Sequence, residues 1–67
     1  MTRKELEIFV ASGTASHRSR MEYEKREAIK AINDGMFAVA AMHIAHAEGH
    51  KQAIEELSFL LETMEVE

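Results

Sequence analysis

The chain has 67 residues, no cysteine, no proline and a formal net charge of −4. This length allows one domain at most, and a domain so small buries only about 60% of the surface of its unfolded chain. Without cysteine, neither a disulfide framework nor a thiolate zinc site can stabilise the fold. We therefore expect a single helical domain (1–67) that gains further burial by forming a homo-oligomer.

Composition also indicates the fold class and the compartment. Ala, Glu, Met, Leu, Lys and Arg are abundant, which favours an all-α fold. The longest apolar run is shorter than the roughly 20 residues that cross a membrane. The N-terminus carries acidic residues and lacks the apolar core of a signal peptide. We expect a cytoplasmic protein with no membrane partner.

The first predicted helix is short. Thr2 is followed three residues later by Glu5, the pattern of a capping box, in which each side chain binds a free backbone amide. Leu6, Phe9 and Val10 then form an apolar stripe with helical spacing. We predict a helix over about 3–11 that ends at Ser12-Gly13.

A second helix is predicted over about 15–33. Residues 18–27 are mostly charged, as in the solvated face of a helix. The sequence Asn33-Asp34-Gly35 then predicts a helix end, because glycine readily adopts the left-handed conformation of the position after a C-cap. Asp34 is also a candidate cap for the next helix.

The remaining chain is predicted to be helical over about 36–48 and 50–65. Glycine inside a helix costs about 1 kcal/mol relative to alanine, so Gly49 either breaks this segment or is tolerated within one long helix. The predicted architecture is a short N-terminal helix followed by an antiparallel helical hairpin. Its second arm is either bent or broken near Gly49 or continuous through it, and several copies form a homo-oligomeric helical bundle.

The segment 35–47 has no charged side chain, and ten of its thirteen residues are apolar. A helix that is apolar nearly all round must be covered from several sides. The first thirty residues carry a charge of +2 and the rest −6. This asymmetry favours antiparallel or head-to-tail pairing, in which opposite ends meet, or it reflects only the solvation of the helix surfaces. The predicted protein interface consists of Phe37, Val39, Met42, Ile44, Leu57, Phe59 and Leu60.

Three histidines suggest a metal site. In a continuous helix, His43, His46 and His50 project from one face. Three imidazoles so placed can bind zinc or another transition metal, alone or together with a second copy. The alternative is that these histidines are buried at an interface and form hydrogen bonds there.

Residues 12–20 suggest an anion site. Hydroxyl and basic side chains gather where the second helix is predicted to begin, and the free amides of a helix N-terminus attract phosphate. The candidate residues are Thr14, Ser16, His17, Arg18 and Arg20. The alternative is a polar loop between helices with ordinary capping.

Other functional classes have little support. Basic and acidic residues alternate along 18–27, so no basic stripe for nucleic acid is present, and no residues assemble a catalytic cleft. We expect a small non-enzymatic interaction module that associates with itself and occupies a partner protein's surface. Such a module acts as an adaptor, co-chaperone or inhibitor, a class that includes phage-type accessory proteins. The alternatives are an oligomer that sequesters a phosphorylated small ligand or nucleotide, and a histidine metal-binding bundle.

Overall fold

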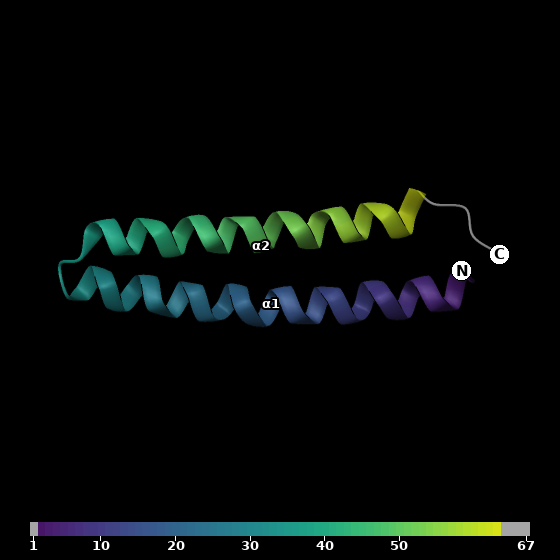
Figure 1. Ribbon diagram of the computed structural model, residues 1–67, viewed down its shortest axis with the longest axis horizontal. Helices are drawn as coiled ribbons and strands as arrows, with labels where there is room; N and C mark the ends of the chain where they lie inside the picture. Colours follow the sequence, from purple (N-terminus) through teal and green to yellow (C-terminus); the bar gives the residue numbers. More distant parts are fainter. Residues whose placement is uncertain (1, 64–67) are drawn as a thin grey trace.

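The fold is an antiparallel hairpin of two long helices (Figure 1). A computed structural model describes residues 2–63, with α1 spanning Arg3–Asn33 and α2 spanning Phe37–Thr63. The expected all-α class and the helical hairpin are confirmed. Within the described residues, neither helix has a stretch long and apolar enough to cross a membrane.

α1 begins at the predicted capping box. The hydroxyl oxygen of Thr2 accepts a hydrogen bond from the Glu5 amide at 3.1 Å. The Glu5 carboxylate in turn accepts one from the Thr2 amide at 2.8 Å. These hydrogen bonds lower the pKa of Glu5 below its ordinary value, because they favour the charged carboxylate. At this open end of the hairpin, Arg3 also donates to the backbone carbonyl of Leu61, 2.8 Å away.

The predicted break at Ser12-Gly13 is wrong, because α1 is continuous through it. Gly13 lies where the two helices approach closely. A Cβ atom built on it would be only 2.9 Å from Cδ1 of Leu57 on α2. The glycine therefore makes room for a side chain of the opposite helix, and it does not reverse the chain.

The turn between the helices forms as predicted. Gly35 has a φ of +73°, the left-handed conformation that glycine adopts without steric cost. The Met36 amide donates to the Ala31 carbonyl at 2.8 Å, and the Gly35 amide donates to the Ile32 carbonyl at 3.0 Å. This pair of hydrogen bonds is the Schellman motif, which satisfies carbonyls at the end of a helix.

α2 is one helix through Gly49, so the predicted alternative of a continuous arm is the correct one. A Cβ atom on Gly49 would meet nothing within 4 Å, so no side chain requires a glycine there. The helix starts at Phe37, one residue after the predicted start. The predicted end near residue 65 lies outside the described residues.

A narrow seam joins the helices. On α2 its buried and half-buried positions alternate by three and four residues, the heptad spacing of a coiled coil: Ala40, His43, Ala47, His50, Ile54, Leu57 and Leu61. On α1 it is lined by Leu6, Val10, Gly13, His17, Met21, Glu24, Ala28 and Ala31. Among residues 2–63, the buried positions are two larger side chains, Leu6 and Val10, and four alanines. A single hairpin therefore has a very small core.

The three glycines respond differently to alanine. Gly49→Ala is expected to stabilise the hairpin by about 0.5–1 kcal/mol, since alanine has the higher helix propensity and the site is open. Gly35→Ala is expected to destabilise it by about 1 kcal/mol or more, because its φ is positive. Gly13→Ala should gain less than Gly49→Ala, because Leu57 must move. Urea unfolding checks this order, and an equal gain at Gly13 and Gly49 would contradict the close approach.

The capping box predicts an acid dependence. The folded-state pKa of Glu5 is lowered, so its contribution to stability is fully present above the ordinary value of 4.5. That contribution is lost as the pH falls through the lowered pKa, where the folded carboxylate takes up its proton. Unfolding of wild type and Glu5→Gln between pH 6 and pH 3 tests this. Wild type should lose more stability than the variant on acidification, and parallel curves would contradict it.

Candidate functional site

Polar side chains gather in the middle of the seam. All four histidines of the chain, His17 on α1 and His43, His46 and His50 on α2, lie there together with Glu24 of α1. They form two adjacent layers: Glu24 contacts His43 and His46, and His17 contacts His50. Since apolar side chains occupy these positions in most coiled coils, the layers are the strongest chemical feature of the hairpin.

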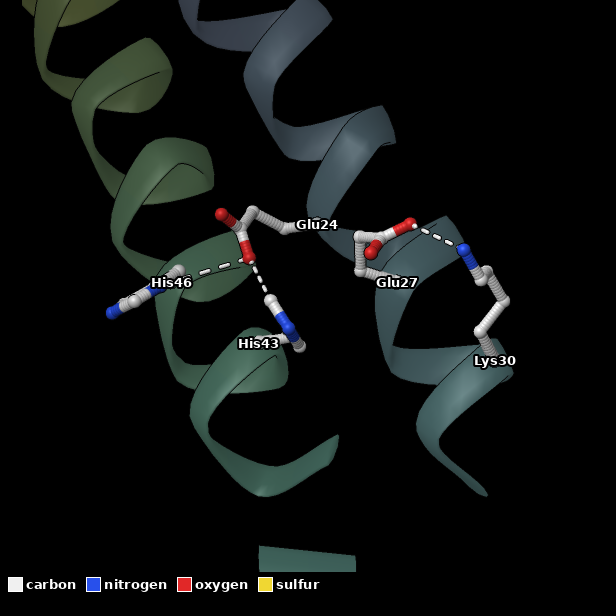
Figure 2. Close-up of polar contacts among 5 residues, drawn as sticks. All are labelled: Glu24, Glu27, Lys30, His43 and His46. Carbon is white, nitrogen blue, oxygen red and sulfur yellow. Dashed lines mark hydrogen bonds and ion pairs between the residues drawn. The ribbon is translucent and has the colours of Figure 1, made fainter. Parts of the chain in front are cut away.

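The first layer is centred on one carboxylate oxygen (Figure 2). Oε2 of Glu24 lies 2.5 Å from Nδ1 of His43 and 3.6 Å from Nδ1 of His46. The side chains of Glu24 and His43 are 15% and 17% exposed, whereas that of His46 is 55% exposed. One imidazole is thus held inside the seam with the carboxylate, and the other stands at its solvent-facing edge.

The environment of Glu24 favours its charged form. Its hydrogen bond to His43 lowers its pKa, and the charges of His43 and His46 act in the same direction, while partial burial opposes them. The neighbouring carboxylates differ in their partners, because Glu22 pairs with Lys25 at 3.9 Å and Glu27 with Lys30 at 3.6 Å. Glu24 is therefore an anion whose partners are imidazoles.

The second layer is a pair of histidines. Nδ1 of His17 lies 2.8 Å from Nδ1 of His50, and the two ring centroids are 5.1 Å apart. At this distance one ring nitrogen donates and the other must accept, so at most one of the two carries a proton on Nδ1. The pair links the two helices by one specific hydrogen bond.

The structure regroups the predicted metal ligands. His43 and His46 are brought together as predicted, but His50 turns to His17 on the other helix. Glu24 takes its place, a residue that the sequence analysis did not select. Helical spacing alone could not identify it. However, Glu24 and His43 are the same number of residues away from the Asn33-Asp34 bond, and so are His17 and His50. Pairing residues at equal distances on either side of the predicted turn would therefore have predicted both contacts.

The predicted anion site loses its structural basis. α1 begins at Arg3, so the predicted residues lie within a continuous helix, where backbone amides bond to carbonyls four residues earlier. Among them Ser16, Arg18 and Arg20 are exposed, and Thr14 and His17 are half-buried. The helix N-terminus that would have attracted phosphate lies elsewhere, at Thr2.

An apolar groove lies near the turn. Its floor includes the seam alanines Ala28 and Ala47, and its walls come from both helices. The other lining residues are Lys25, Ile29, Ile32, Ile44 and Glu48. Lys25 and Glu48 give it a cation on the α1 wall and an anion on the α2 wall.

The predicted interface residues divide between the seam and the surface. Leu57 is half-buried against Gly13, so it belongs to the seam within one chain, and Val39 is half-buried. The other five are exposed: Phe37, Met42, Ile44, Phe59 and Leu60. Comparison of the chain with protein-family models, curated proteins and solved structures finds no match.

The histidine pair predicts an unusual response to substitution. Replacing both members by leucine (His17→Leu with His50→Leu) should stabilise the hairpin by about 1–3 kcal/mol, because apolar side chains then fill two half-buried seam positions. Either single change should give less than half of that gain, since it leaves a polar ring nitrogen facing leucine. Urea unfolding at one fixed chain concentration measures this. A double variant less stable than wild type would show that the hydrogen bond contributes net stability.

Proposed function

We propose that this chain is a non-enzymatic interaction module that pairs with a second copy of itself and then occupies the surface of a partner protein. The main support for this proposal is that the isolated hairpin leaves many large apolar side chains exposed. Residues 2–63 include eleven: Ile8, Phe9, Tyr23, Ile29, Ile32, Met36, Phe37, Met42, Ile44, Phe59 and Leu60. Exposed apolar surface on this scale is typical of a surface that binds another protein.

Size and shape support association. The accessible surface is 4974 Å², whereas a globular protein of this mass exposes about 4,300 Å². The radius of gyration is 15.4 Å, compared with about 11 Å for a compact domain of equal length. The molecule is a rod with extents of 52 × 15 × 11 Å, so most of its side chains have no second layer to pack against.

The groove near the turn is the surface that suits a second copy. Six of the eleven exposed apolar residues lie between Ile29 and Ile44, around this end of the rod. A two-fold axis running along the groove would set α1 of each copy over α2 of the other. Lys25 of each copy would then face Glu48 of the other copy, so two-fold symmetry would form this contact twice. The charges of the groove are therefore complementary to those of an identical groove. Pairing there would form a four-helix bundle.

The open end of the rod is the surface left for a different protein. Ile8 and Phe9 of α1 and Phe59 and Leu60 of α2 are exposed there, away from the groove. α2 borders this end with the exposed carboxylates Glu55, Glu56 and Glu62, whereas α1 carries the exposed cations Arg3 and Lys4. An apolar surface with an anionic border on its α2 side suits a partner that carries basic residues on the facing side. The phosphorylated-ligand alternative is not retained, since its helix N-terminus is missing from residues 14–20.

Substitution of one isoleucine tests the self-association. Ile29→Ala should weaken pairing roughly a hundredfold or more, because the two-fold dimer loses one groove isoleucine from each copy and each truncation costs about tenfold or more. Alanine favours helix, so the hairpin itself should remain folded. Sedimentation equilibrium over a hundredfold range of concentration gives the dissociation constant, and circular dichroism reports the helix content.

Ile8→Ala is the matched control. Ile8 and Ile29 lie on the same helix and are 61% and 60% exposed, but only Ile29 lines the groove. The control should change the dissociation constant by less than about threefold, since no groove contact is lost. A wild type that stays monomeric throughout, or equal effects of the two variants, would contradict pairing at the groove.

A further inference from the structure

The ligand geometry of the first polar layer points to a metal site. We propose that Glu24, His43 and His46 bind one divalent transition-metal cation, with zinc as the reference ion. One carboxylate oxygen and one ring nitrogen from each histidine lie within 4.8 Å of one another. None of these three residues lines the groove near the turn, so metal binding does not depend on self-association there.

One of the two ligand distances to Glu24 already matches a metal centre, and the other is about 1 Å shorter. Tetrahedral zinc with ligands at about 2.1 Å holds its ligand atoms about 3.4 Å apart. Nδ1 of His46 is already 3.6 Å from Oε2 of Glu24. Nδ1 of His43 is 2.5 Å from the same oxygen, so the two groups are joined by a hydrogen bond through one proton. An ion that replaces this proton would move the two atoms apart by about 1 Å, which a side-chain rotation can supply.

The donor set suits a transition metal. Two imidazoles and one carboxylate are ligands that zinc and other first-row divalent ions accept, whereas magnesium and calcium prefer oxygen ligands only. Glu24 supplies the negative charge, and its contacts in the structure are to these two imidazoles. In Figure 2, the side chain of Glu27 instead points to Lys30, away from the histidines. The nearby carboxylate is therefore already paired with a cation.

The fold holds the ligands in place and leaves one side open. Glu24 and His43 are held in the seam on opposite helices, so the ion would clamp α1 to α2. His43 and His46 are three residues apart on one helix and therefore share a face. The exposed His46 provides the path by which the ion enters, and water can fill the remaining coordination position.

Titration of the complete chain with zinc tests the site. The protein is stripped with a chelator, exchanged into chelator-free buffer and titrated with ZnCl₂ by isothermal calorimetry. We expect one zinc ion per chain. At a free zinc concentration about a hundred times the dissociation constant, the apparent unfolding constant should fall about a hundredfold. NMR of the ring nitrogens should show shifts at Nδ1 of His43 and His46, with His17 and His50 largely unchanged.

Variants distinguish this cluster from its neighbours. Glu24→Gln, His43→Gln and His46→Gln should each weaken zinc binding tenfold or more. His46→Gln is the decisive change, because this exposed side chain can be replaced without disturbing the seam. The controls His17→Gln and Glu27→Gln replace a histidine and a carboxylate outside the cluster, and they should bind zinc within threefold of wild type.

Three results would overturn the proposal. The first is a wild-type chain that shows no saturable uptake of zinc. The second is a His46→Gln variant that is helical without metal and binds zinc as tightly as wild type. The third is a response of His17 and His50, rather than His43 and His46, in the NMR titration.

Discussion

The close approach of α1 and α2 along an alanine-lined seam determines where the larger side chains lie. Near the turn, Ala28 and Ala47 are buried in the seam and form the floor of the groove. Ile29, Ile32 and Ile44 project beside the seam rather than into it, so they line its flank and remain exposed. Toward the open end, Gly13 allows the same close approach by making room for Leu57. The small core of the hairpin and its exposed apolar flank thus have one origin.

The polar layers add specificity to the register that the Gly35 turn sets. Contacts between alanines are alike at every step, so the alanines themselves favour no particular register. Glu24 with His43 and His17 with His50 are specific pairs, and a shift of one residue would separate both. Polar residues at seam positions of coiled coils specify register at some cost in stability. The same constraint gathers the three ligand atoms of the proposed metal site.

Features that depend on local sequence could be predicted. The capping box at Thr2 and the left-handed Gly35 involve residues within a few positions of each other, and both are confirmed. Local reasoning wrongly predicted a break at Ser12-Gly13. The glycine is needed there because Leu57, far away in the chain, packs against it. The predicted anion site depended on this break and lost its basis with it.

The candidate site was predictable in part. The spacing of His43 and His46 predicted two of the three proposed ligands correctly as neighbours, because both lie on one helix. Glu24 and the partner of His50 require the pairing of two helices, which periodicity within one helix does not contain. The predicted interface combined residues of the seam with residues of the outer surface, because the pairing of the helices decides which is which. Leu57 faces α1, whereas Phe59 faces solvent.

The central claim is that the isoleucines flanking the narrow seam are covered by a second copy of the chain. Isotope-filtered NOE spectroscopy tests it most directly, on an equal mixture of methyl-labelled and unlabelled chains. The account predicts intermolecular NOEs from the methyl groups of Ile29, Ile32 and Ile44 to the unlabelled chain. If these methyl groups show contacts only within their own chain at millimolar concentration, the claim is contradicted.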